Sequence, residues 1–157
     1  MSKFQLKNFF EASYDLMLVF SQFFIISLHF FQWEFLPQKQ IIQASPFSYL
    51  MGILIVIIAF IIMLVSIKDL GRNLSPFPRP LNNSNLVTTG IYGFTRHPMY
   101  YSLIFISIGF FIIKLSIYHL FLTISLALII KFKIALEEKY LINKFKNYLL
   151  YKNEVKV

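Results

Sequence analysis

The sequence predicts an all-α integral membrane protein, because of its composition and the length of its apolar segments. Hydrophobic residues make up 57% of the 157 residues and charged residues only 14%, against roughly a quarter charged in soluble domains. The mean hydropathy is +0.66. Helices are the expected form of the apolar segments, since a helix satisfies its own backbone hydrogen bonds inside a bilayer.

Four apolar segments are expected to form transmembrane helices within one domain, residues 1–157. Segment 14–36 has about 23 residues, enough to span with some tilt, and segment 48–67 contains no charged residue. Segments 99–113 and 115–130 have about 15 residues each, or about 23 Å of helix. This length predicts a short helical hairpin that dips into the bilayer.

Two polar stretches flank the hairpin. Residues 68–98 hold three arginines and four prolines, and a connection of this length usually has a function. Residues 131–151 alternate charged with apolar positions at helical spacing. This last stretch is expected to extend the fourth segment out of the membrane and then to lie along its surface as an amphipathic helix.

The net charge is +8. Because the cations flank apolar segments and do not form one nucleic-acid-binding stripe, we expect them to set the membrane topology and to attract anionic lipid headgroups. By the positive-inside rule, both termini and the loop at 68–98 face the cytoplasm, as expected for a bacterial inner-membrane protein. Because the chain has no cysteine, disulfides and thiolate metal sites are excluded. The three histidines, at 29, 97 and 119, lack the spacing of metal ligands. No obligate protein partner is indicated.

The stretch at 86–102, LVTTGIYGFTRHPMYYS, gathers polar side chains between two apolar segments. Cations at a membrane boundary are costly without an anionic partner. We expect this stretch, the Gly71–Asn73 segment and the Glu137–Glu138 pair to meet there. Cations, carboxylates and aromatic rings together suit a zwitterionic sulfonium cofactor with a ribose and an adenine, S-adenosylmethionine.

Simpler interpretations of the same residues remain open. Arg96 and His97 can anchor the chain to lipid phosphates, and the two glutamates can form a solvated helix face among lysines. His29 lies seven residues after Gln22 and so shares its helix face. It can form a helix–helix hydrogen bond or contribute to a substrate site.

The chain resembles the isoprenylcysteine carboxyl methyltransferase and phospholipid methyltransferase superfamily of integral membrane enzymes. The family pattern is Leu-Val-Thr-x-Gly-x-Tyr, then Arg-His-Pro-x-Tyr, a helical hairpin, and Glu-Glu-x-x-Leu. The last element here begins at Glu137 and is followed by Phe145, Tyr148 and Tyr151. The resemblance covers roughly residues 68–151.

The resemblance implies methyl transfer from S-adenosylmethionine to a lipidic or amphiphilic acceptor. Arg96, His97 and Glu138 are then the expected catalytic residues. Lys133, where the family often has Arg, and His29 are the candidates for binding the acceptor. The implied cofactor-binding residues are Leu86, Val87, Tyr92, His97, Pro98, Tyr100 and Glu137.

Two other classes of protein share part of this pattern. Membrane sterol and enone reductases, which use NADPH, have a similar C-terminal signature, but theirs reads His-Pro-Asn-Tyr and Met99 stands at the Asn position here. The other alternative is a non-catalytic membrane adaptor whose polar loop binds lipid.

Overall fold

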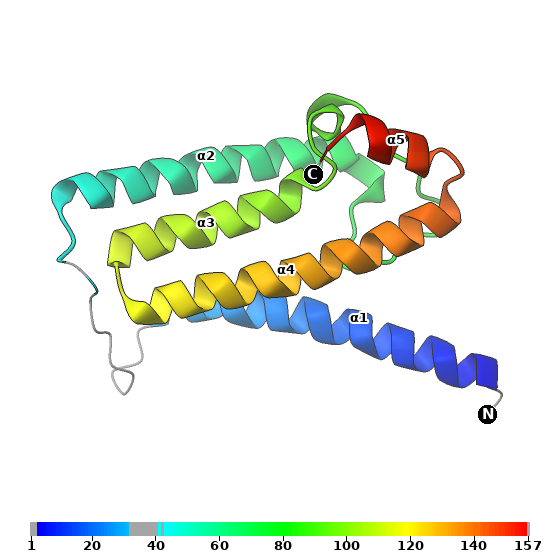
Figure 1. The fold of residues 1–157 in the computed structure, drawn as a ribbon, viewed down its shortest axis with the longest axis horizontal. Helices are drawn as coiled ribbons and strands as arrows, with labels where there is room; N and C mark the ends of the chain where they lie inside the picture. The colour runs from blue at the N-terminus through cyan, green and yellow to red at the C-terminus, as the bar shows by residue number, and fades with distance from the viewer. Residues whose placement is uncertain (1–2, 32–40, 42, 157) are drawn as a thin grey trace.

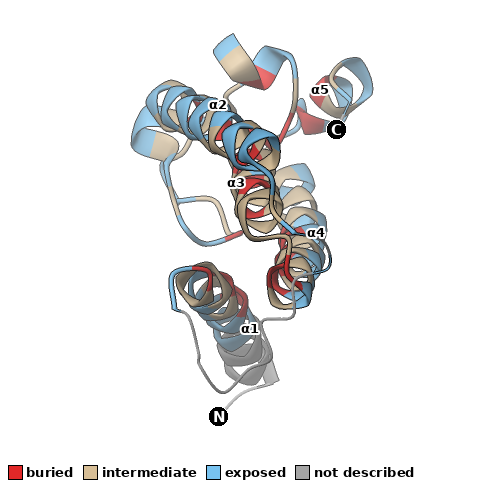
Figure 2. Ribbon diagram, turned by 90° about the vertical axis from the view of Figure 1, so that its left-hand side faces the viewer, coloured by how far each residue is buried: buried red, intermediate tan, exposed pale blue. Residues whose placement is uncertain are grey.

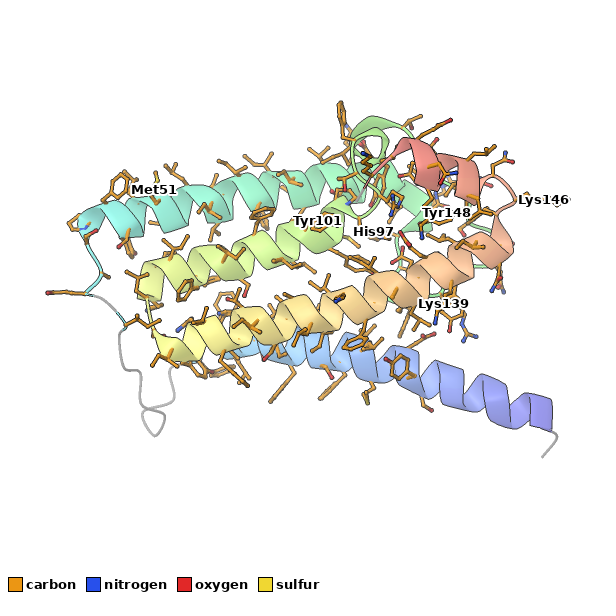
Figure 3. All side chains as sticks on the ribbon, viewed as in Figure 1. Met51, His97, Tyr101, Lys139, Lys146 and Tyr148 are labelled. Atoms are coloured by element: carbon orange, nitrogen blue, oxygen red, sulfur yellow. The ribbon has the colours of Figure 1, made fainter. Side chains whose placement is uncertain are left out.

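Four long helices lie side by side in a computed structural model of the chain, which describes residues 3–31, 41 and 43–156 (Figure 1). The loop between α2 and α3, the short helix α5 and the start of α1 lie at one end of the bundle. The turn between α3 and α4 lies at the opposite end. Figure 3 places His97 and Tyr148 at the first end and Met51 at the other. The elements are α1 (Lys3–Leu28), α2 (Pro46–Leu70), the 3₁₀ turns η1 (Gly71–Asn73) and η2 (Gly90–Gly93), α3 (Pro98–Lys114), α4 (Ile117–Lys144) and α5 (Tyr148–Glu154).

The all-helical prediction is confirmed, and two of the helices are long and apolar enough to cross a membrane. These are the 28-residue helices Pro46–Asn73 and Ile117–Lys144. The apolar part of α1, Ala12–Leu28, and helix α3 are shorter. The structure therefore supports two spans by length and composition, where the sequence predicted four.

The first helix differs in its bounds from the predicted segment 14–36. Helix α1 begins at Lys3 and ends at Leu28, and a turn follows, in which the amide of Phe30 donates to the carbonyl of Ser27 (3.0 Å). Residues 32–36 of the predicted segment lie outside the described residues. The first turns of α1 contain polar residues. Hydropathy alone therefore did not predict that the helix begins there.

Helices α2 and α3 pack closely because each presents a glycine to the other. A Cβ on Gly109 would lie 2.5 Å from Val56 Cγ2 and 2.9 Å from the carbonyl oxygen of Gly52. A Cβ on Gly52 would in turn lie 2.8 Å from the carbonyl oxygen of Gly109. Small residues at both positions let the two backbones approach, as is common between helices in membranes.

The predicted hairpin is present, but its second helix is longer than 115–130. The turn rests on Leu115, whose φ of 45° is left-handed, and on Ser116, whose hydroxyl accepts from the amide of His119. Helix α4 then runs unbroken to Lys144, so it includes the first part of the stretch 131–151. A separate helix, α5, begins at Tyr148 after the extended Phe145.

Helix α1 attaches to the other helices through polar contacts. His29 Nε2 lies 2.7 Å from Ser107 Oγ in α3, and Lys133 Nζ in α4 donates to Gln22 Oε1 (2.5 Å). His29 and Gln22 are both buried, but Gln22 lies within α1 and His29 lies in the turn that follows it. Figure 2 shows the buried positions gathered on α3 and on the sides of α4 and α1 that face the bundle interior. The observed contact of His29 is thus a hydrogen bond between the turn after α1 and helix α3.

The loop at 68–98 is ordered around Asp69 at the end of α2. Its Oδ2 accepts from the amide of Ile91 (2.9 Å), and the carboxylate occupies the space where a Cβ of Gly90 would stand. Gly90 also has a φ of +62°, which favours glycine. This contact holds η2 against α2 and places Tyr92 in the interior.

Candidate cofactor pocket

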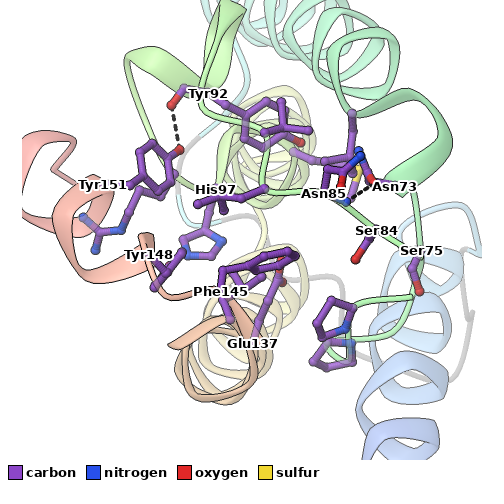
Figure 4. Close-up of a pocket in the computed structure, with 18 of the residues that line it drawn as sticks. Asn73, Ser75, Ser84, Asn85, Tyr92, His97, Glu137, Phe145, Tyr148 and Tyr151 are labelled. Carbon is purple, nitrogen blue, oxygen red and sulfur yellow. Dashed lines mark hydrogen bonds between the residues drawn. The ribbon is translucent and has the colours of Figure 1, made fainter. Parts of the chain in front are cut away.

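One pocket lies where the loop, the start of α3, the end of α4 and α5 meet (Figure 4). It encloses about 740 Å³ of empty space, which includes a part open to solvent. Its walls come from four regions that are far apart in the sequence. The lining residues are Leu70, Asn73, Ser75, Phe77, Pro78, Pro80, Ser84, Asn85, Leu86, Val87, Tyr92, Arg96, His97, Met99, Tyr100, Glu137, Leu141, Phe145, Tyr148 and Tyr151.

Most of the predicted cofactor residues line this pocket. They are Leu86, Val87, Tyr92, His97, Tyr100 and Glu137, and Arg96 joins them. Pro98 is buried as the first residue of α3 and does not line the pocket. Glu138, Lys133 and His29 are also absent from the lining.

Glu137 and Tyr100 form a pair inside the pocket. The Tyr100 hydroxyl donates a hydrogen bond to the Glu137 carboxylate. The Tyr100 ring is buried and stacks on the His97 ring, with ring centroids 5.8 Å apart. No cation lies within ion-pair distance of Glu137 in the described part of the chain. The carboxylate therefore has acceptor capacity left for a ligand.

His97 is neutral at physiological pH. Burial lowers its pKa to about 4, and the nearby charges of Arg96 and Lys152 act in the same direction. Glu138, whose Oε1 is 3.4 Å from His97 Nε2, opposes this shift only in part. His97 can thus act through hydrogen bonds and its ring face, not as a cation.

Arg96 and Glu138 bind each other beside the pocket. Arg96 donates from Nε (3.0 Å) and Nη2 (2.9 Å) to Glu138 Oε1. Arg96 Nη1 donates to the carbonyls of Lys152 (3.2 Å) and Val155. Lys152 Nζ completes the set with a 2.5 Å contact to Glu138 Oε2. We call Arg96, Glu138 and Lys152 the α5 latch, because they connect the loop, α4 and α5.

Helix α5 brings two tyrosines into the pocket. Tyr151 Oη donates to the carbonyl of Tyr92 (2.6 Å). Tyr148 is 1% exposed, and its hydroxyl has no hydrogen-bond partner among the described residues. The sequence signature contains both residues, but it gave neither a role.

Residues 73–85 supply a neutral polar side of the pocket. Asn73 Oδ1 accepts from the amide of Asn85 (2.9 Å), and Ser75 and Ser84 lie on the same side in Figure 4. All four residues lie in the loop at 68–98 that was expected to serve the cofactor, but only Asn73 fell within one of its segments that was expected at the site. Amides and hydroxyls in a loop carry no periodic signal, so the others were missed.

Lys133 lies behind Tyr100 and not in the pocket. Its Nζ donates to Gln22 Oε1 and to the carbonyl of Pro76 (3.1 Å), and it lies 5.1 Å from the centre of the Tyr100 ring. The side chain is 1% exposed. His29 is farther along the bundle, between Ser107 and the ring of Phe110.

The latch predicts that Glu138→Gln loosens α5. The substitution keeps the shape of the side chain and removes the charge that Arg96 and Lys152 share. Hydrogen bonds to a charged group contribute about 1.5–3 kcal/mol each, so protection of α5 amides against hydrogen exchange should fall at least about tenfold. Amides in the middle of α2 and α3 should keep their protection.

The control for this experiment is Glu154→Gln, which removes an exposed carboxylate at the end of the same helix. It should leave α5 protected. Wild-type protection of α5 in Glu138→Gln would mean that the latch does not hold the helix.

Comparison with known proteins gives the chain a family. The pattern of the phospholipid methyltransferase family matches residues 47–148. Protein-S-isoprenylcysteine O-methyltransferase of Saccharomyces cerevisiae is 32% identical over 120 residues, which are 73% of this chain and 49% of the yeast protein. The chain thus spans about half the length of that relative. No solved structure matches the chain.

The matched region contains the α2–α3 pair, the loop, α4 and Tyr148, and so almost all of the pocket. The resemblance that the motifs carried is confirmed. The chain belongs to the phospholipid methyltransferase family, whose methyltransferases use S-adenosylmethionine.

Proposed function

We propose that this chain transfers the methyl group of S-adenosylmethionine to a lipidic or amphiphilic acceptor. The observation that carries the proposal is the pocket itself, which unites Glu137, His97 and Tyr92 with the tyrosines of α5. Family membership favours methyl transfer over the two alternatives, an NADPH-dependent reductase and a lipid-binding adaptor.

The lining of the pocket fits this cofactor. The acceptor capacity of Glu137 suits a cationic or hydroxyl-bearing part of the donor. Aromatic rings of Tyr92, Tyr100 and Phe145 offer faces for the adenine and the sulfonium. The unpartnered hydroxyl of Tyr148 is a buried polar atom that a ligand would satisfy.

The protein's part in the reaction is to bind, to orient and to exclude water. The bound donor supplies a methyl group on a sulfonium, which an acceptor atom displaces in line. Because such a displacement needs little covalent chemistry from the protein, alignment gives most of the rate. In this proposal His97 and Glu137 hold the donor, while Arg96 and Glu138 act as positioning residues through the latch.

The acceptor is proposed to arrive from the bilayer. An apolar cavity enclosing about 710 Å³ of space, part of it open, lies between α1, α2, α3 and α4. Its lining includes Ile26, Phe60, Phe110 and Leu126, and these residues suit a lipid tail.

Helix α4 links this cavity to the pocket along one face. Leu126 lines the cavity, Lys133 follows two turns later, and Glu137 lines the pocket. Eleven residues of helix span about 16 Å, a length that an acyl or prenyl chain covers. Lys133 and His29 are therefore proposed to border the path of the acceptor.

The pocket is further proposed to face the cytoplasm, where the donor is made. The supporting observation is the distribution of Lys and Arg. Most of them lie in the N-terminal region, in the loop at 68–98 and in the C-terminal stretch from residue 131, which the positive-inside rule places in the cytoplasm. S-adenosylmethionine is charged and does not cross membranes. The side of a sealed vesicle from which it supports the reaction therefore shows which way the pocket faces.

The transfer prediction is that purified protein moves a labelled methyl group from S-adenosylmethionine to a component of a total lipid extract. Glu137→Gln should reduce the rate at least tenfold, because it replaces the carboxyl group proposed to bind the donor with a neutral amide. Glu154→Gln should react like the wild type. In sealed vesicles, inside-out preparations should react without detergent and right-side-out ones should not.

Absence of labelled lipid from the wild type, with labelled water-soluble product in its place, would rule out a lipidic acceptor. Reaction in right-side-out vesicles alone would reverse the proposed orientation.

The entry prediction concerns the chain length of the acceptor. Burial of each CH₂ contributes about 0.8 kcal/mol to membrane partitioning. Once the acceptor is identified, an analogue shortened by four carbons should show a kcat/KM lower by about two orders of magnitude. Equal kcat/KM values for both analogues would contradict entry from the bilayer.

A further inference from the structure

Tyr148 is a buried residue that the fold alone does not explain. It lies in α5 with 1% of its surface exposed, lines the pocket, and has an unpartnered hydroxyl among the described residues. Leaving a buried hydroxyl without a partner costs about 1–3 kcal/mol. Phenylalanine would fill the same space without this cost. The hydroxyl therefore points to a partner that is not part of the chain.

Tyr151, one turn later in α5, has a hydroxyl with a hydrogen-bond partner inside the protein. Its ring meets the Tyr148 ring edge-on, with centroids 5.9 Å apart, and its hydroxyl donates to the carbonyl of Tyr92. The two tyrosines thus share a helix and a pocket but differ in their hydroxyl contacts. Burial raises the pKa of Tyr148 above its usual value, so its hydroxyl stays protonated and can donate at any physiological pH.

The pocket has two chemically different sides, which Figure 4 displays. Asn73, Ser84 and Asn85 form the neutral side, with amides and hydroxyls that suit the edges of an adenine. Tyr148 lies on the other side with His97, near the charges of Arg96 and Glu138. A side with charged groups of both signs suits a zwitterion.

We propose that the Tyr148 hydroxyl binds the amino-acid end of the methyl donor. The inference rests on the proposed function, because it takes S-adenosylmethionine as the ligand of this pocket. In this proposal α5 contributes a ligand-binding side chain to the pocket in addition to shielding it from solvent. The α5 latch then positions Tyr148 for the ligand, and binding of the donor stabilises α5 in return.

The test compares two ligands that differ at that end. S-adenosylhomocysteine carries the amino-acid group, whereas 5′-methylthioadenosine has the same adenosine and thioether sulfur without it. Their affinities for the purified full-length protein are measured by calorimetry for the wild type, Tyr148→Phe and Tyr151→Phe. Tyr148→Phe should weaken S-adenosylhomocysteine about tenfold and change 5′-methylthioadenosine less than twofold.

The ratio of the two affinities is the decisive quantity, because partial unfolding lowers both affinities equally and leaves the ratio unchanged. A fall of the ratio in Tyr148→Phe alone supports the proposal. The control variant Tyr151→Phe removes a bond within the protein, so it should weaken both ligands alike. An unchanged ratio in Tyr148→Phe would overturn the inference. Failure of the wild type to bind either ligand would instead overturn the proposed function.

Discussion

The ion pair between Arg96 and Glu138 is the interaction on which the pocket depends. Nη2 and Oε1 are 2.9 Å apart, and the two side chains are only 7% and 13% exposed. Breaking such a pair by removing one partner is costly, because the other charge stays partly buried. Arg96 comes from the loop and Glu138 from α4, so the pair closes two walls of the pocket. Through Lys152 and two carbonyls it also holds α5. A seven-residue helix has little stability of its own, so α5 depends on these contacts, on the Tyr151–Tyr92 hydrogen bond and on the burial of Tyr148.

The helices that carry the loop are held by two further contacts. Helices α2 and α3 approach closely at Gly52 and Gly109, toward the end of the pair away from the loop that joins them. Asp69, at the end of α2, then sets the position of η2. Binding side chains on a loop are precise when the elements beneath them are fixed. The loop at 68–98 follows this rule, since it is anchored near both of its ends.

The sequence predicted the part of the site that lies in one continuous stretch. Leu86, Tyr92 and His97 line the pocket. Their motif lies in the loop that joins two neighbouring helices, α2 and α3. The sequence assigned Glu137 to the cofactor and Glu138 to catalysis, but only Glu137 lines the pocket. Neighbouring residues of a helix point about 100° apart, so only one of them faces the pocket. Which one does so depends on Arg96, a partner 42 residues away.

Other parts of the fold depended on contacts that no local pattern contains. Helix α1 ends at Leu28 although apolar residues continue, and α5 separates from α4 after Lys144. The side chain of Lys144 donates to the carbonyls of Leu81 and Asn82 in the loop. Such tertiary contacts override the helical periodicity of residues 131–151, which on its own favoured a single helix.

The central claim, that this pocket holds S-adenosylmethionine, is tested most directly by ultraviolet crosslinking of the labelled cofactor to the wild-type protein. The crosslinked peptides are then identified by mass spectrometry. The account predicts label in the peptides that contain Tyr92, Tyr100 or Tyr148, and loss of label when excess S-adenosylhomocysteine competes. Competed label confined to α1 and the first half of α2 would contradict the account.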